Sequence, residues 1–144
     1  SDGWNGREVA GDGRHVRYAL GDGGPGTLVD FALEPAMAQG SWGFGEGVVH
    51  HCAFQVQDHD AQDAIKGRLE GLGFTDTSER KDRGYFDSIY VRTPGGAMFE
   101  ATVSKPAGFT VDEAADALGK TFQVPPVFAA RRDEILSFLA PLKF

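Results

Sequence analysis

The chain has 144 residues, 41% of them hydrophobic and 24% charged, which is the composition of an ordinary single globular domain. Its 14 Lys and Arg residues against 21 Asp and Glu residues give a net charge of −7, and no basic run is present, so nucleic acid is not an expected partner. No apolar run approaches the roughly 20 residues of a membrane span, and a single cysteine, unable to form an internal disulfide, favours a cytoplasmic location.

The first third of the sequence predicts a β-hairpin. Residues 15–20 (HVRYAL) and 27–33 (TLVDFAL) are typical of strands, and a glycine-rich turn, GDGGPG, separates them. Residues 34–47 are expected to form a loop that ends in GFGEG. Its glycines lead into a strand, whereas phosphate-binding glycine loops lead from a strand into a helix. We therefore interpret this loop as a connector.

The middle of the chain predicts a β-α-β-β-β unit. A strand is expected over 48–56, followed by a helix over 58–72 that begins at Asp58 and stops at Gly73. A short strand over 74–78, a charged turn over 78–84 and strands over 85–92 and 97–103 complete the unit, with TPGG as the last turn. Two further helices, over 110–119 and 127–139, are expected to close the chain.

Side chains alternate between the two faces of a strand, which allows the faces to be predicted. In the first strand of the unit, one face is the more apolar and is expected to lie under the helix; it carries His50, Cys52, Phe54 and Val56. Ile65 and Leu69 of the helix are expected to cover it, which makes Cys52 a small buried hydrophobe. The same alternation gathers His51, Tyr90 and Glu100 on the opposite face of the sheet.

The pair formed by His51 and Glu100 suggests a metal site. One imidazole and one carboxylate are two thirds of a 2-His-1-carboxylate site, which holds a divalent ion and leaves coordination positions open for substrate. A histidine paired with a glutamate for purely structural reasons is the alternative that spacing leaves open. No Ser-His-Asp triad can be placed in the sequence.

Three segments taken together resemble a known family: GVVHHCAFQVQD (47–58), DRGYFDSIYVRTPGGAMFEAT (82–102) and AGFTVDEAADALGKTFQVPPVFAARRDEI (107–135). They are similar to the C-terminal portion of hydroquinone-type ring-cleaving (extradiol-like) dioxygenases of the vicinal oxygen chelate, or glyoxalase/bleomycin resistance/dioxygenase, superfamily. The resemblance covers about residues 45–140. It implies an α+β fold of βαβββ modules, with a curved mixed sheet, a concave metal cleft and C-terminal helices.

By this resemblance, the chain is one structural domain with three parts. Residues 1–44 would be the end of a preceding, incomplete βαβββ module and a connector, residues 45–105 a complete module, and residues 106–144 a C-terminal helical tail. Relatives of this kind carry four modules, and their remaining histidine ligand lies in the first. The chain is therefore expected to be a C-terminal domain or truncated product that lacks this ligand, binds Fe(II) weakly and is inactive by itself.

The resemblance also implies a function, which is cleavage of a hydroquinone- or catechol-like aromatic with O₂ at Fe(II), with Mn(II) as an alternative metal. It assigns His51 and Glu100 as metal ligands, and it places His50, Arg83 and Tyr90 in the substrate pocket as catalytic residues. This placement of His50 conflicts with the strand-face argument, which puts His50 on the helix side or at the sheet edge.

Two other functions remain open at this point. The same fold and ligand pair would suit a glyoxalase-type metal-dependent isomerase or transferase. A non-catalytic small-molecule-binding protein of this fold is the second alternative, although such proteins usually lack the metal ligands. An open sheet edge tends to recruit another chain, so a homodimer is expected, held by contacts from residues 15–33 and 48–103.

Overall fold

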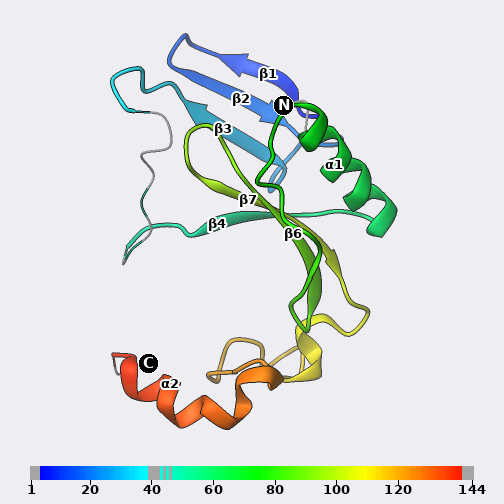
Figure 1. Cartoon of the computed structure of the whole chain (residues 1–144), viewed down its shortest axis with the longest axis vertical. Coiled ribbons are helices and arrows are strands. Elements are labelled where there is room, and N and C mark those ends of the chain that lie inside the picture. The colour runs from blue at the N-terminus through cyan, green and yellow to red at the C-terminus, as the bar shows by residue number, and fades with distance from the viewer. Residues whose placement is uncertain (1–3, 39–42, 44, 46, 141–144) are drawn as a thin grey trace.

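The computed structural model describes residues 4–38, 43, 45 and 47–140, which form two β-sheets, two α-helices and two 3₁₀ turns. The first sheet has the order β1-β2-β3 and the second β4-β7-β6-β5. Figure 1 shows the first sheet at one end of the molecule and the C-terminal segment at the other, with the second sheet between them. No helix in this part of the chain is both long and apolar enough to cross a membrane. The elements are β1 (Arg7–Gly11), β2 (His15–Ala19), β3 (Leu28–Ala32), β4 (His51–Gln55), α1 (His59–Gly71), β5 (Lys81–Asp82), β6 (Phe86–Arg92), β7 (Met98–Ser104), η1 (Gly108–Val111), η2 (Pro126–Arg131) and α2 (Arg132–Phe138).

The predicted hairpin is confirmed as β2 and β3, which pair antiparallel from His15 opposite Ala32 to Ala19 opposite Leu28. The glycine-rich turn between them is closed by the amide of Leu20, which donates to the carbonyl of Thr27 at 2.9 Å. Strand β1 was not predicted. All five of its residues are exposed, so it lacks the apolar alternation that marks a strand, and its register with β2 shifts between Glu8 and Ala10.

Helix α1 forms where it was predicted and packs on one face of the second sheet. The side chain of Asp58 accepts a hydrogen bond from the amide of Ala61 at 2.8 Å, which caps the first turn. Gly73, just past the helix end, has a φ of 93°, which favours glycine. On the face toward the sheet, α1 contributes Ile65 and Leu69 to the buried core, which they form with Ile89, Val91 and Ala101 of β6 and β7.

The prediction that Cys52 is a buried hydrophobe is wrong, because α1 lies over β6 and β7 while β4 is the edge strand of its sheet. Cys52 is exposed. Of the three expected partners of α1 on this strand face, Val56 packs against the core. Phe54 instead packs on Trp4 and Phe99, with ring centroids 5.7 and 5.1 Å away.

Strand β4 starts later than predicted, and the short strand predicted over 74–78 forms elsewhere. Strand β4 begins at His51 rather than at residue 48, because its parallel partner β7 begins at Met98, directly opposite His51. Residues 74–78 were expected to form a strand but make a turn, in which the Thr77 hydroxyl donates to the carbonyl of Phe74 at 2.9 Å. The short strand β5 lies a few residues later, in the stretch expected to be a turn, and pairs antiparallel with β6.

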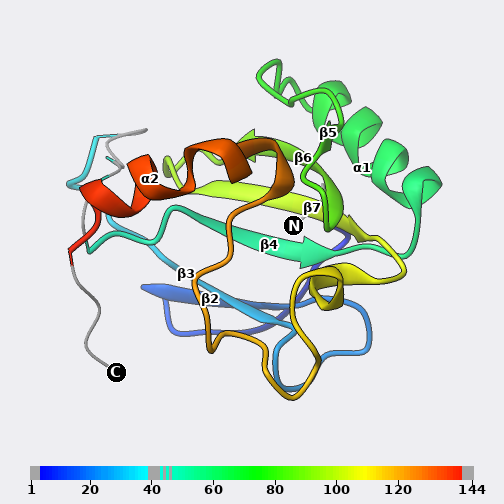
Figure 2. The same ribbon diagram turned by 90° about the horizontal axis from the view of Figure 1, so that it is seen from below.

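The C-terminal segment folds mainly as turns, and the predicted helix over 110–119 does not form. The carboxylate of Glu113 accepts hydrogen bonds from the amides of Gly119 at 2.9 Å and Thr121 at 3.2 Å, and these bonds hold a loop in place of helical turns. The second predicted helix forms in part, as η2 followed by α2. Figure 1 shows the segment from η1 to α2 below the second sheet, away from α1, and in Figure 2, seen from below, the segment crosses in front of β4.

Candidate active site

The strand register brings three of the predicted site residues onto one face of the second sheet. Glu100 of β7 lies opposite Ala53 of β4 on one side and opposite Tyr90 of β6 on the other. His51 is two residues before Ala53 and therefore shares that face. Ile89, Val91 and Ala101, the neighbours of these site residues in sequence, point the other way into the core under α1. The predicted gathering of His51, Tyr90 and Glu100 away from the helix is thus what the structure contains.

Glu100 and His51 approach each other closely without forming a proper hydrogen bond. The Glu100 side chain is 1% exposed, and Nε2 of His51 lies 2.8 Å from its Oε2. Even so, neither carboxylate oxygen accepts a well-aligned hydrogen bond within the described part of the chain. A buried carboxylate without hydrogen bonds is energetically costly, which favours a cation beside it. Two donor atoms at this separation also suit ligands that share one ion, since metal–N and metal–O bonds are about 2.0–2.2 Å.

Tyr90 and Arg83 lie beside this pair and interact with each other. Nε of Arg83 donates to the Tyr90 hydroxyl at 3.0 Å, and the guanidinium carbon lies 5.2 Å from the ring centroid. Arg83 is positioned by the turn between β5 and β6, where Gly84 has a φ of 84° and its amide donates to Asp82 at 2.7 Å. Burial, and next the nearby Glu100 carboxylate, raise the pKa of the Tyr90 phenol above its ordinary value of 10.0, while Arg83 acts to lower it.

His50 lies in the same cleft, just before the edge strand β4, whereas the strand-face argument placed it on the helix side or at the sheet edge. The argument failed because β4 begins at His51, so His50 precedes the strand and does not follow its alternation. The Nδ1 atoms of His50 and His51 are 2.8 Å apart, and the two rings are nearly perpendicular, at 89°. The structure therefore places all five residues named from the sequence in one cleft, and the roles that the resemblance gives them stay predictions.

These five residues line one cleft of about 980 Å³, and its other wall comes from the C-terminal segment. This wall was not predicted, and it is made largely of apolar side chains: Phe109, Pro125, Pro126, Val127 and Phe128. Phe109 is anchored on Tyr85 with ring centroids 4.7 Å apart, and the Tyr85 hydroxyl donates to Asp112. In the sequence, only the adjacent prolines and the apolar residues around them could have indicated this wall. Their spacing does not say which part of the molecule they face.

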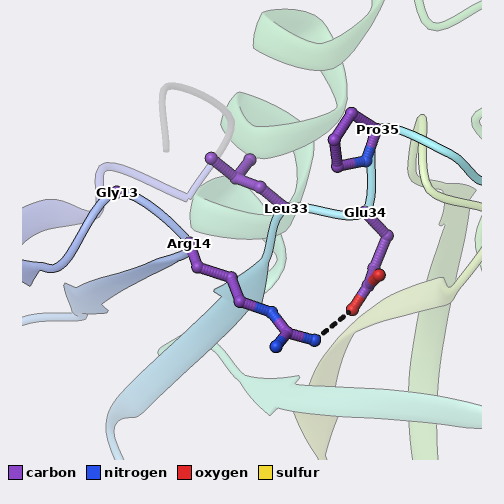
Figure 3. Close-up of a pocket in the computed structure, with 5 residues that line it drawn as sticks. All are labelled: Gly13, Arg14, Leu33, Glu34 and Pro35. Carbon is purple, nitrogen blue, oxygen red and sulfur yellow. Dashed lines mark hydrogen bonds and ion pairs between the residues drawn. The ribbon is translucent and has the colours of Figure 1, made fainter.

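Within the described residues, no group of three or more His, Cys, Asp and Glu side chains is placed to hold a metal ion. The cleft therefore supplies two facing donors, His51 and Glu100. A second hollow of about 680 Å³ lies between the turn after β1 and the segment after β3 (Figure 3). There the exposed Arg14 and Glu34 side chains form an ion pair at 3.1 Å, so their charges offset each other. Both of these side chains are exposed, whereas the carboxylate of the cleft is buried and accepts no aligned hydrogen bond within the described residues.

Comparison with known proteins identifies relatives of this chain. The chlorohydroquinone/hydroquinone 1,2-dioxygenase of Sphingobium indicum is 49% identical over 133 residues, which are 92% of this chain and 41% of the relative. The chain thus spans about two fifths of the length of the curated relatives it matches. No family model matches the chain.

Solved structures show the same fold. A crystal structure of a Bacillus subtilis protein assigned as a dioxygenase matches with a TM-score of 0.74 and 28% identity, over 96% of this chain and 43% of that protein. A glyoxalase/bleomycin resistance protein/dioxygenase domain from Frankia matches with a TM-score of 0.59 and 15% identity, over 73% of this chain and 78% of that domain. The chain therefore has the fold of the glyoxalase/bleomycin resistance/dioxygenase proteins, and its sequence is similar to part of the ring-cleaving dioxygenases.

Proposed function

We propose that this chain forms part of a metal-dependent ring-cleaving dioxygenase that acts on hydroquinone- or catechol-like aromatics with O₂. The observation that carries the proposal is the buried Glu100 carboxylate, which has no aligned hydrogen bond and faces the Nε2 atom of His51. The homologous hydroquinone dioxygenase supports the choice of reaction and of substrate class. Because the chain spans two fifths of that relative, the activity belongs to the proposal for the whole protein.

His51 and Glu100 would hold a divalent ion, for which we propose Fe(II), with Mn(II) as the alternative. A neutral imidazole and one carboxylate suit either metal, and the carboxylate offsets part of the positive charge of the ion. When bound, this metal supplies the one-electron chemistry that lets O₂ react with an aromatic ring. A third protein ligand, expected to be a histidine, stays a prediction from the sequence, as does association into a homodimer.

The remaining polar residues of the cleft would hold the substrate and move its protons. Arg83 carries a positive charge that would stabilise a phenolate oxygen, and it already donates to the Tyr90 hydroxyl. Tyr90, whose pKa is raised, stays protonated at neutral pH and would donate a hydrogen bond to a bound oxygen. His50 would accept or return a substrate proton. The apolar C-terminal wall would contact the ring faces and exclude water.

Metal binding by the chain tests the proposal directly. We expect Mn(II), followed by electron paramagnetic resonance, to bind to the chain and to lose this binding on His51→Ala or Glu100→Gln. The molecule offers a matched control in His59 and Asp87, another histidine and carboxylate, with Nε2 and Oδ2 3.0 Å apart. Substitution of His59 by Ala should leave Mn(II) binding unchanged. Equal binding by the His51→Ala chain and the unaltered chain would refute the site.

Oxygen consumption tests the reaction separately from the site. An oxygen electrode with hydroquinone and Fe(II) should record uptake by a protein that contains this chain with its complete ligand set, and His51→Ala in that protein should abolish the uptake. The chain alone is expected to consume little oxygen. Metal binding without hydroquinone-dependent oxygen uptake in that larger protein would instead favour the isomerase or transferase alternative.

A further inference from the structure

The contact between the two adjacent histidines restricts where their protons lie. Nδ1 of His50 and Nδ1 of His51 are 2.8 Å apart, and the ring centroids are 5.1 Å apart. Two N–H groups cannot face each other at this distance, and two lone pairs would repel. One Nδ1 atom must therefore donate and the other accept, so the tautomer of each imidazole depends on that of its neighbour.

A metal ion on His51 would decide the direction of this hydrogen bond. The Nε2 atom of His51 is the one that faces Glu100, so it is the atom that would bind an ion shared with the carboxylate. A neutral imidazole binds metal through a lone pair, and its proton then lies on the other nitrogen. Metal-binding histidines nearly always donate this second N–H to a nearby acceptor, which fixes the orientation of the ring. Here the neighbouring acceptor is Nδ1 of His50.

We propose that His50 is the positioning residue of the metal-binding imidazole: with a divalent ion on Nε2 of His51, Nδ1–H of His51 donates to Nδ1 of His50, and His50 carries its own proton on Nε2. This inference rests on the proposed metal site. It assigns to His50 a role in metal binding that is separate from any contact with substrate.

The protons balance between the two states. Without metal, the favourable arrangement places a proton on Nε2 of His51, next to the Glu100 carboxylate, and a proton on Nδ1 of His50, which donates to His51. With metal, one proton has moved along the Nδ1–Nδ1 hydrogen bond to His51. The other has left His51 Nε2 for solvent, while His50 Nε2 has taken one up. Both rings are neutral before and after, and no net proton is released. Metal binding thus converts His50, a residue of the cleft, into its Nε2–H form.

Nitrogen NMR of the histidine rings tests this inference on the 144-residue chain, with Zn(II) as a diamagnetic, redox-inert probe. Long-range ¹H–¹⁵N spectra distinguish a protonated ring nitrogen from an unprotonated one. Saturating Zn(II) is expected to shift Nε2 of His51 to a metal-bound value and to move the proton of His50 from Nδ1 to Nε2. His15 and His59, whose partners are Asp12 and Asp87, are expected to keep their tautomers and serve as internal controls.

Two variants separate an acceptor role from a packing role. His50→Asn places an amide oxygen near the position of Nδ1 and keeps the acceptor, whereas His50→Leu removes it. We expect Zn(II) affinity to fall about 10–100-fold in His50→Leu and to stay closer to that of the unaltered chain in His50→Asn. Equal affinity in all three chains, or Zn(II) on His51 with His50 still protonated at Nδ1, would overturn the inference alone. Absence of any Zn(II)-dependent change at His51 would overturn the proposed metal site as well.

Discussion

On each face of the second sheet, a carboxylate of the sheet lies beside a histidine, and the two pairs differ in one decisive respect. On the α1 side, Nε2 of His59 forms a hydrogen bond with Asp87 at 3.0 Å, and Nζ of Lys105 lies 3.8 Å from the same carboxylate. On the cleft side, Nε2 of His51 is even nearer to Glu100, at 2.8 Å, yet Glu100 accepts no aligned hydrogen bond in the described part of the chain.

Burial sharpens this difference. The Asp87 side chain is 17% exposed and Glu100 1%, so the carboxylate with less access to water is also the one without satisfactory partners. Such a group lowers the stability of the folded state, because the cost of removing its charge from water is not compensated by hydrogen bonds. A satisfied pair needs no function to explain it, whereas an unsatisfied buried carboxylate supports the proposed metal site. We therefore expect substitutions on the α1 face mainly to change stability and substitutions on the cleft face mainly to change metal binding.

The largest expected effect is on the packing face. Ile89 is 2% exposed and lies in the core under α1, next in sequence to Tyr90. We expect Ile89→Ala to lower the free energy of unfolding by about 2–5 kcal/mol, because it removes buried methyl groups and leaves a cavity. Urea denaturation followed by circular dichroism measures this. The folded fraction should still bind Mn(II) with unchanged affinity.

Tyr90→Phe is the matched control on the other face of the same strand. It removes one hydroxyl from a partly buried ring and leaves the packing volume almost unchanged. We expect a change below about 1 kcal/mol, the net contribution of one hydrogen bond. If Tyr90→Phe destabilised the chain as much as Ile89→Ala, the cleft face would be part of the structural core and the separation of the two faces would be wrong.

The second prediction compares the two carboxylates directly, with metal removed by a chelator. Glu100→Gln should raise the free energy of unfolding by about 1 kcal/mol, because it removes a buried charge that lacks hydrogen bonds. Asp87→Asn should lower it by about 1 kcal/mol, because this carboxylate has a hydrogen-bond partner. Opposite signs are therefore expected from the same chemical change. Destabilisation by both substitutions would show that Glu100 is satisfied in the metal-free chain.

The sequence predicts those features of the sheet and the cleft that depend on the local alternation of side chains along a strand. Alternation along β6 and β7 correctly separated Tyr90 and Glu100 from Ile89, Val91 and Ala101, because both strands are paired on both sides and their period of two is fixed. The same rule failed at His50, which lies before the first paired residue of β4. It failed also for the burial of Cys52, because alternation says which face a residue is on and not whether a helix covers that position.

The apolar wall of the cleft could not be predicted, because its position depends on contacts between segments far apart in sequence. Phe109 is held by Tyr85 of the segment before β6, and Asp112 accepts from the hydroxyl of the same tyrosine. Residues 110–119 have helical spacing, but the hydrogen bonds to Glu113 stabilise a loop instead. Helix propensity in a short segment is weak, and such side-chain bonds override it.

A third prediction concerns the electrostatics of the cleft face. Burial of Tyr90 raises its pKa above 10.0, and Arg83 lowers it by donating to the phenol oxygen. Arg83→Met removes the lowering contribution, so the pKa of Tyr90 should rise further. Since the raised pKa favours the protonated form in the folded state, this contribution to stability is complete below pH 10 and lost as the pH rises through the folded pKa. Ultraviolet absorbance during alkaline titration, with Tyr90→Phe as the blank, measures the pKa. A lower value in Arg83→Met would contradict the assignment.

The smallest effect is expected in the C-terminal wall, where one carboxylate organises a loop. The Thr121 hydroxyl, and next the Gly119 amide, hold the pKa of Glu113 below its ordinary value of 4.5. This contribution is therefore present above pH 4.5 and lost as the pH falls through the lowered pKa. Glu113→Gln keeps the shape but weakens these bonds, so the amides of Gly119 and Thr121 should exchange hydrogen faster while global stability stays nearly constant. Hydrogen exchange followed by NMR resolves the two amides. The control is Glu134→Gln, which alters an exposed carboxylate of α2 that is paired with Arg131. Unchanged exchange in Glu113→Gln would mean that the wall is held by the contacts of Tyr85 with Phe109 and Asp112 and not by Glu113.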